Sequence, residues 1–178
     1  MNDTQISKFI SLVLRHKPEK INTKLTDDGY CDVDVLIKGV REKFNIDFTL
    51  QDLERIVTED NKQRYSFKGN MIRANQGHSI DVHLGLKEKI PNGNLFHGTA
   101  RRFKENILKE GITKQSRQYV HLSGDINTAI NVGKRHGEPM VLVIDAKAMY
   151  EDGYKFYLSE NGVWLTDYVP VKYIKRGY

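Results

Sequence analysis

The sequence predicts an α+β protein made of two lobes, and three observations support this prediction. The first part of the chain has three stretches with apolar residues at helical spacing, followed by two short alternating stretches around a turn. The second part changes to short strand-like stretches separated by helices. A length of 178 residues suits two small lobes. We place the boundary near Pro91, which gives an N-terminal lobe of residues 1–90 and a C-terminal lobe of residues 91–178.

The first predicted element is an amphipathic helix that ends before Pro18. One helical face carries its apolar residues, namely Ile6, Phe9, Ile10, Val13 and Leu14. Because proline disfavours the helical conformation of the residue before it, Arg15 and His16 are expected on the last turn, where the helix dipole favours cations. A basic last turn that only complements this dipole is the plainer alternative to a functional role.

Two further helices and a hairpin complete the predicted first lobe. Asp32 and Thr49 are each placed to cap a helix, because apolar residues at helical spacing follow both of them. Residues 64–68 and 71–74 then alternate on either side of Gly69-Asn70, as in a β-hairpin. Helices followed by a two-stranded wing indicate a winged helix.

The second lobe is predicted to be mostly antiparallel β structure. After a weakly patterned segment, a strand is expected at residues 95–98, and a helix stopped by Gly111 follows it. Residues 140–145 form an apolar run typical of a central strand. The remaining predicted strands follow as a meander, at residues 155–158, 163–166 and 169–174.

Residues 119–137 combine a strand and a helix with polar groups on each. His121 and Ser123 alternate with apolar neighbours, so they share one face of the predicted strand. A helix capped by Ser123 or Asp125 comes next, with Arg135 near its C-terminal end and Gly137 as its stop. A buried strand and helix with a solvated basic end is the plainer interpretation of this stretch.

The composition restricts the classes of function. A net charge of +5 favours an anionic partner such as nucleic acid. We expect a cytoplasmic protein without membrane contact, because the sequence has no secretory signal and no apolar run near the roughly 20 residues that cross a bilayer. The single cysteine, Cys31, is expected to be a small core residue. No metal is expected, since neither a His-Glu-x-x-His helix nor a cysteine cluster occurs.

Four sites with arginine or histidine lie at the predicted ends of elements, where a side chain can point into a cleft. They are Arg15-His16, Arg73, His97 and Arg135. The planar donors of arginine match the oxygens of a phosphate group, so converging arginines would hold a phosphate. For each arginine taken alone, an ordinary surface cation is the alternative.

Two tripeptides offer a second interpretation. His97-Gly98-Thr99 and His121-Leu122-Ser123 have the His-x-Thr/Ser pattern of two-histidine phosphoesterases, in which the histidines act as general base and acid on a cyclic phosphate. The two motifs lie close together in the sequence for that fold.

Six short motifs occur together in the chain. They are Leu14-Arg15-His16-x-Pro18, Arg73-Ala74-x-Gln76-Gly77-His78-Ser79, Phe96-His97-Gly98-Thr99, Val120-His121-Leu122-Ser123, Gly133-x-Arg135-His136-Gly137 and Asn161-Gly162-Val163-Trp164-Leu165-Thr166. In this order and spacing the chain resembles the NAD-dependent RNA 2′-phosphotransferases (KptA family), over residues 7–174.

This resemblance implies a fold, two ligands and a set of site residues. The N-terminal lobe would be a winged helix that binds RNA, and the C-terminal lobe would have the ADP-ribosyltransferase fold and bind NAD. The implied catalytic tetrad is Arg15, His16, Arg73 and Arg135. The residues implied to line the NAD site are His97, Gly98, Thr99, His121 and Ser123.

The resemblance also implies a reaction in two steps, on RNA with an internal 2′-phosphate such as a tRNA splice junction. The RNA phosphate first attacks the nicotinamide ribose and expels nicotinamide, which leaves an ADP-ribosylated phosphate on the RNA. A ribose hydroxyl then attacks the phosphorus and releases RNA 2′-hydroxyl and ADP-ribose 1″,2″-cyclic phosphate. NAD would be consumed as a co-substrate, no metal would take part, and a monomer is the simplest expectation.

Two other functions stay open at this point. An ADP-ribosyltransferase acting on protein or nucleic-acid ends usually carries a catalytic glutamate, and the chain has apolar residues around Val163 but Glu160 nearby. If Glu160 faces the site, this function gains support. The third alternative is a non-catalytic winged-helix protein that binds RNA.

Overall fold

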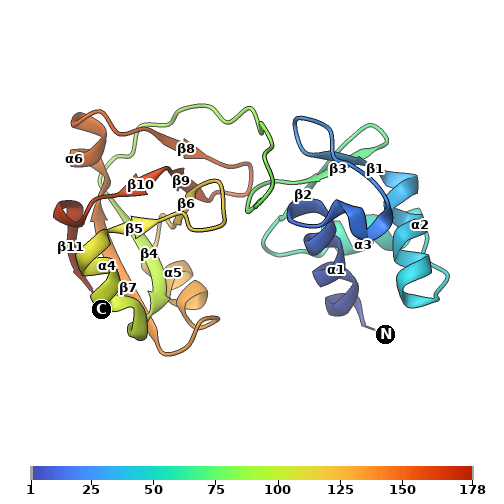
Figure 1. The fold of residues 1–178 in the computed structure, drawn as a ribbon, viewed down its shortest axis with the longest axis horizontal. Helices are drawn as coiled ribbons and strands as arrows, with labels where there is room; N and C mark the ends of the chain where they lie inside the picture. Colours follow the sequence, from blue (N-terminus) through green and yellow to red (C-terminus); the bar gives the residue numbers. More distant parts are fainter. Residues whose placement is uncertain (1, 178) are drawn as a thin grey trace. The chain divides into compact units, whose positions relative to one another are not determined.

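The computed structural model describes residues 2–177, and the fold of these residues is α+β, as predicted (Figure 1). Contacts divide the chain into two compact units, Met1–Gly85 and Leu86–Tyr178. The division therefore comes after Gly85, whereas the change in sequence pattern suggested a boundary near Pro91. Among the described residues, no helix has the length and apolar character needed to cross a membrane.

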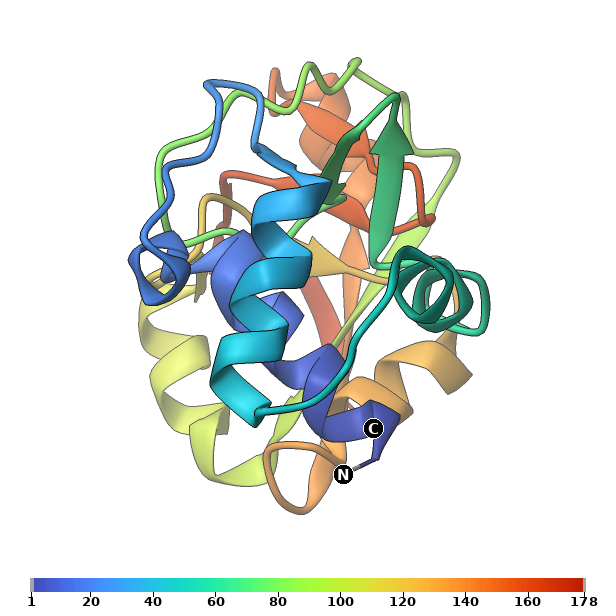
Figure 2. The same ribbon diagram turned by 90° about the vertical axis from the view of Figure 1, so that its right-hand side faces the viewer.

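The described residues of unit 1 form three α-helices and one small antiparallel sheet. The helices are α1 (Asp3–Arg15), α2 (Val33–Phe44) and α3 (Leu50–Thr58), with a short 3₁₀ helix, η1 (Pro18–Ile21), after the first. Helix α2 packs against both α1 and α3, and Figure 2 shows α2 in front of α1. The sheet has the order β1-β3-β2, with β1 (Tyr30–Asp32), β2 (Tyr65–Lys68) and β3 (Met71–Ala74). All three helices and the hairpin confirm the sequence predictions, whereas β1 was not expected.

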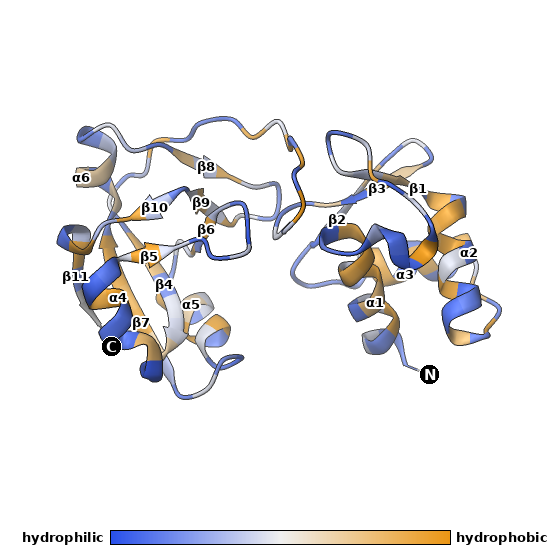
Figure 3. Cartoon of the chain, in the orientation of Figure 1, coloured by the Kyte–Doolittle hydropathy of each residue, from blue (hydrophilic) through white to orange (hydrophobic). Residues whose placement is uncertain are grey.

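The apolar faces of these helices meet in one core. Ile10, Leu14, Leu36 and Leu53 are fully buried in it, and apolar residues on α1 and α2 are visible in Figure 3. Cys31 also belongs to this core, as predicted. Burial, followed by the charge of Asp32, raises the pKa of the Cys31 thiol to about 11, so the thiol is protonated at neutral pH.

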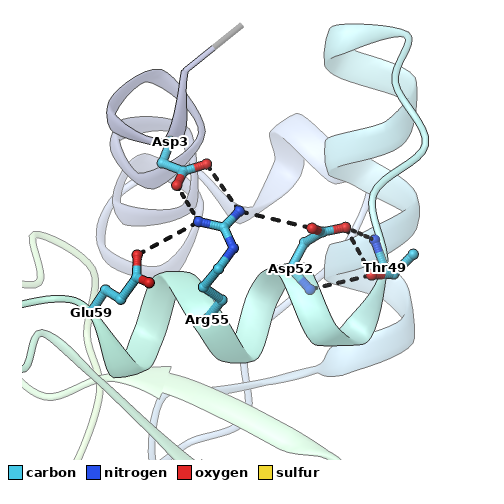
Figure 4. A network of polar contacts seen from close by, with 5 residues as sticks. All are labelled: Asp3, Thr49, Asp52, Arg55 and Glu59. Atoms are coloured by element: carbon cyan, nitrogen blue, oxygen red, sulfur yellow. Dashed lines mark hydrogen bonds and ion pairs between the residues drawn. The ribbon is translucent and has the colours of Figure 1, made fainter.

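Polar side chains along α3 tie this helix to the start of α1. Thr49 and Asp52 form a capping box, in which each side chain binds the backbone N–H of the other residue. Arg55 binds the carboxylate of Asp3 and lies 3.8 Å from Asp52 and 3.6 Å from Glu59 (Figure 4). The hydrogen bond from Arg55 holds the pKa of the Asp3 carboxyl below its ordinary value. This network is exposed, so it aligns two helices without adding a buried charge.

After β3, residues 75–85 remain with unit 1 although they form no helix or strand. Val82 and Leu84 in this segment are buried, and the N–H of His83 donates to the carbonyl of Asp27 at 2.7 Å. The segment is therefore a packed part of unit 1, and it returns toward the end of α1.

As far as residue 177, where the described part of the chain ends, unit 2 forms three separate antiparallel sheets. One has the order β11-β7-β4, with β4 (Asn94–Ala100), β7 (Pro139–Asp145) and β11 (Ile174–Gly177). The second has the order β6-β9-β8, with β6 (Val120–Leu122), β8 (Phe156–Leu158) and β9 (Trp164–Thr166). The third pairs β5 (Ile112–Thr113) with β10 (Tyr168–Val169). The central position of β7 confirms the prediction made for residues 140–145.

Short helices connect these strands. They are η2 (Arg101–Phe103), α4 (Lys104–Glu110), α5 (Ile126–Gly133), α6 (Ala146–Glu151) and η3 (Val171–Tyr173). Gly111 follows the last residue of α4, as predicted, and α6 was not expected.

The prediction of one strand at residues 169–174 and of a closing meander was wrong. Pro170 has no N–H to continue a ladder, and it is the N-cap of η3, which lies between β10 and β11. Among the described strands β8 to β11, only β8 and β9 pair with each other as consecutive strands, because β10 pairs with β5 and β11 pairs with β7. Alternation identifies a strand, but the partner of that strand depends on contacts with distant parts of the chain.

Candidate active site

The C-terminal end of α1 carries the first two candidate residues. Arg15 is the last helical residue and His16 is the C-cap. The segment after β3 packs onto this end: the N–H of Ser79 donates to the carbonyl of Arg15 at 3.0 Å, and Ser79 Oγ lies 2.8 Å from His16 Nδ1. Gly77 is needed here, because its φ is +93° and a Cβ would lie 3.3 Å from Arg15 Nε. Ser79 therefore holds the backbone of one candidate residue and the ring of the other.

Arg73 comes from the central strand of the unit 1 sheet. It lies opposite Tyr30 in the register of β1 and β3, and its guanidinium lies 4.8 Å from the centre of the Tyr30 ring. Its Nη1 donates to the carbonyls of Asp28 at 3.1 Å and of Leu84 at 3.3 Å. These contacts direct the side chain of Arg73 toward the packed segment that follows β3.

His78 lies inside this group of cations. Only 1% of the residue is exposed, and neither ring nitrogen has a hydrogen-bond partner among the described residues. Burial is the largest cause that lowers the pKa of His78, and the positive charges of Arg15, His16 and Arg73 lower it further, to about 4. His78 is therefore neutral at physiological pH, and the structure brings Arg15, His16 and Arg73 together around it.

A cluster of this kind can bind an anion with more than one negative charge. Arginine donors form short, charge-assisted hydrogen bonds with phosphate oxygens, and several donors can bind one phosphate together. Because His78 is uncharged, it adds no further repulsion among the cations around it.

The candidate residues of unit 2 lie where β4 meets β6. Phe96 and Ser123 exchange two backbone hydrogen bonds, of 2.9 and 2.7 Å, and form an isolated bridge between the two sheets. Next to this bridge, His97 Nδ1 lies 3.0 Å from the carbonyl oxygen of His121. A carbonyl oxygen only accepts, so Nδ1 of His97 carries the proton and Nε2 is left as an acceptor. Burial lowers the pKa of His97, which favours this neutral ring.

The other two residues of the β4 motif have different environments. A Cβ at Gly98 would lie 1.8 Å from the carbonyl oxygen of Ala129, so α5 packs directly on the backbone of β4 at this point. Because backbone groups alternate along a strand, the N–H and C=O of Gly98 point to the same side as those of Phe96, which faces β6. Thr99 is buried, so its side chain belongs to the interior of unit 2.

The ring of His121 has a partner that the sequence did not indicate. Arg117 Nη1 lies 2.9 Å from His121 Nδ1. His121 and Ser123 are half-buried, whereas their neighbours Val120 and Leu122 are core residues. This is the pattern that the alternation predicted.

Arg135 lies in unit 2, apart in the chain from the cluster of unit 1. Helix α5 begins with Asp125 as its cap, which was one of the two expected caps, and it ends at Gly133. Arg135 therefore follows the helix in a turn, where its N–H donates to the carbonyl of Val132 at 3.2 Å and the residue is exposed. Glu160 is also exposed, in the turn between β8 and β9.

Three residues of these sites had no role predicted from the sequence. His78 and Ser79 were part of a motif that contributed to the family resemblance, so their importance could have been suspected from that motif. Arg117 belongs to a polar loop with no pattern of its own. Among residues 2–177, no group of three or more His, Cys, Asp and Glu side chains is arranged to hold a metal ion.

Comparison with known proteins gives one consistent result. Residues 1–168 match the family model described as RNA 2′-phosphotransferase, Tpt1 / KptA family. The chain is 56% identical to a probable RNA 2′-phosphotransferase of Fusobacterium nucleatum, with 98% of each chain covered. It is 53% identical to a protein of the same name from Flavobacterium johnsoniae, with 96% of this chain and 94% of the relative covered. A third such relative, from Streptomyces coelicolor, is 42% identical over 96% of this chain and 93% of its own.

Proposed function

The chain belongs to the RNA 2′-phosphotransferase, Tpt1 / KptA family, and we propose that it removes an internal 2′-phosphate from RNA by transferring it to NAD. The observation that carries this proposal is the cluster of Arg15, His16 and Arg73 around the neutral ring of His78. A 2′-phosphate is a dianion on a ribose, which is the kind of group that such a cluster can bind.

Unit 1 is proposed to be a winged-helix lobe that binds the RNA. Its order of three helices and a three-stranded sheet with a β2–β3 hairpin supports this proposal. The net charge of +5 is consistent with contacts to the RNA backbone. A splice junction with an internal 2′-phosphate is the substrate class that we propose.

Unit 2 is proposed to be an ADP-ribosyltransferase-like lobe that binds NAD. Support comes from its two three-stranded sheets, which are joined by the bridge between Phe96 and Ser123, and from the two histidines beside this bridge. His97 Nε2 accepts hydrogen bonds, which suits a ribose hydroxyl. The backbone of Gly98 faces the same side as that of Phe96, and we propose that it binds the carboxamide of nicotinamide. Thr99, His121 and Ser123 would complete this site.

The side chains of the proposed tetrad would act on the phosphate rather than on a metal. Arg15 and Arg73 would orient the RNA phosphate as it attacks the nicotinamide ribose and displaces nicotinamide. In the second step a ribose hydroxyl attacks the phosphorus and loses its proton, and His16 would supply a proton to the departing RNA 2′-oxygen. Arg135 would stabilise the negative charge that develops on the phosphoryl oxygens.

The test uses a short oligoribonucleotide with one internal 2′-phosphate, incubated with the full chain with and without NAD. We expect loss of the phosphate and formation of ADP-ribose cyclic phosphate only when NAD is present, as measured by mass spectrometry. The same oligonucleotide without the phosphate is the control. Release of phosphate without NAD would favour a phosphoesterase, and ADP-ribose on protein or on an RNA end would favour a different transferase.

A second test separates the two ligands. His97→Ala should weaken binding of NAD by about tenfold, the cost of one hydrogen bond from a buried group, and leave binding of the phosphorylated RNA nearly unchanged. An equal loss of both affinities would mean that His97 only supports the fold of unit 2.

A further inference from the structure

We propose that Arg117 is a positioning residue that fixes the tautomer of His121, so that the two histidines of unit 2 offer opposite hydrogen-bonding groups to a bound dinucleotide. His97 would present an acceptor at Nε2, and His121 would present a donor at Nε2. The identity of the ligand rests on the proposed function, whereas the two tautomers rest on contacts within unit 2.

The contact between Arg117 and His121 has only one chemically allowed direction. A guanidinium group carries five N–H donors and no acceptor, so Arg117 Nη1 donates across the 2.9 Å to His121 Nδ1. Nδ1 must therefore hold a lone pair, and the proton of the neutral ring lies on Nε2.

The contact at His97 has the opposite direction. The backbone carbonyl of His121 can only accept, so His97 Nδ1 donates across 3.0 Å and His97 Nε2 holds the lone pair. His121 thus orients the ring of His97 with its backbone, while its own ring is oriented by Arg117. The bridge between Phe96 and Ser123 keeps the two strands in the register that this arrangement needs.

Opposite tautomers suit the chemistry of a nucleotide. A ribose offers hydroxyl donors beside oxygen atoms that accept, such as its ring oxygen and the neighbouring phosphate oxygens. An acceptor on β4 and a donor on β6 can bind one group of each kind. If His121 took the other tautomer, its Nε2 lone pair would face a ligand oxygen and one hydrogen bond would be lost.

The direct test is to read both tautomers in the full chain without any ligand. Protein with ¹⁵N-labelled histidine, studied by long-range ¹H–¹⁵N NMR, should show the proton of His97 on Nδ1 and that of His121 on Nε2. The two rings are assigned from the spectra of His97→Gln and His121→Gln. In Arg117→Met, which removes the donor and keeps a similar chain length, His121 should redistribute between its tautomers. Arg117→Lys keeps a donor and should largely restore Nε2–H.

The matched control is Lys109→Met, which removes one positive charge from an exposed position in α4 of the same unit. It should leave the tautomer of His121 unchanged. A wild-type His121 ring with its proton on Nδ1, or an Arg117→Met ring that keeps Nε2–H, would overturn the proposal.

A binding measurement gives the functional consequence. Arg117→Met should raise the dissociation constant for NAD about tenfold, which corresponds to about 1.4 kcal/mol, with no change in binding of the phosphorylated RNA. If Lys109→Met lost as much affinity for NAD as Arg117→Met, the change in net charge would explain both losses, and this would count against the proposal. If the wild-type chain binds no NAD, the proposed function fails, while the tautomers measured without ligand still decide the role of Arg117.

Discussion

The two units hold their candidate residues by different means. In unit 1, Arg15 and His16 lie at the end of a helix, and a segment without regular structure fixes them through Ser79. In unit 2, His97 and His121 lie within strands, and backbone pairing sets their positions. Strand register is strongly specified where one face is buried, whereas a loop relies on a few individual contacts. We therefore expect unit 2 to tolerate backbone changes poorly and unit 1 to be sensitive to single side-chain contacts.

The two units also differ in the charges and hydrogen bonds of their candidate residues. Unit 1 gathers cations around a ring that burial keeps neutral, which suits binding of a multiply charged anion. Unit 2 instead fixes the direction of individual hydrogen bonds at His97 and His121. Unit 1 therefore attracts charge, whereas unit 2 orients polar groups. The following experiments compare the two units.

The largest effect is expected from Arg135→Ala, which tests whether unit 2 contributes to phosphate chemistry. Removing a preorganised donor costs about 100- to 1,000-fold in rate, so turnover should fall by this amount. NAD should still bind, and ADP-ribosylated RNA should accumulate in a mass-spectrometric time course. Lys134→Ala removes the neighbouring exposed cation and should have little effect. Full turnover by Arg135→Ala would remove this residue from the tetrad.

The next largest effect is on stability and compares glycines of the two units. In unit 2, a Cβ at Gly98 would lie 1.8 Å from a backbone oxygen of α5, so Gly98→Ala should lower the free energy of unfolding by about 3 kcal/mol. In unit 1, a Cβ at Gly39 would lie 2.2 Å from Cγ2 and 2.7 Å from Cβ of Ile21, so the short helix η1 that carries Ile21 would have to shift. Alanine is more favourable than glycine inside a helix by about 1 kcal/mol, so Gly39→Ala should lower the free energy of unfolding by less than Gly98→Ala.

Urea unfolding followed by amide exchange in each unit measures both changes. Gly93→Ala is the control, because a Cβ there would meet nothing within 4 Å. Equal losses at Gly98 and Gly39 would contradict the difference between the units.

A pH effect on unit 1 should be smaller. Unfolded histidine binds its proton near pH 6.5, whereas the pKa of folded His78 is about 4, so the unfolded state binds more protons between these values. The stability that neutral His78 contributes is present above pH 6.5 and is lost as the pH falls toward 4, with about 2 kcal/mol already lost at pH 5. His78→Gln should flatten this dependence, and substitution of the exposed His83 should not. Parallel curves for wild type and His78→Gln would show that another group is responsible.

The smallest effect concerns the loop contact to His16. Ser79→Ala removes the hydroxyl that lies 2.8 Å from His16 Nδ1, while the backbone bond from Ser79 to Arg15 can remain. Loss of one hydrogen bond of about 1 kcal/mol should lower kcat five- to tenfold without changing the affinity for NAD. Ser79→Thr keeps a hydroxyl and should recover most of the rate. If Ser79→Ala and wild type have the same kcat, this contact does not position His16.

Most residues of the candidate site could be predicted one by one from the sequence, but which of them lie close together could not. Arg15, His16 and Arg73 were predicted because they lie at the ends of predicted elements. The structure brings these three together through a segment that has no periodic pattern. His78 was not predicted to be buried, because no apolar pattern surrounds it and its burial depends on distant residues. Whether Arg135 acts with the residues of unit 1 stays a prediction.

By itself the sequence determined the local features of this protein: the buried face of α1, the caps Asp32 and Thr49, and the hairpin around Gly69-Asn70. These features depend on groups within one helical turn or one tight turn, so nearby residues are sufficient to specify them. The tertiary structure decided the pairing of β11 with β7, the contact of Ser79 with His16 and the orientation of the His97 ring by His121. Each of these contacts joins residues far apart in the chain, so it forms only when the whole unit packs.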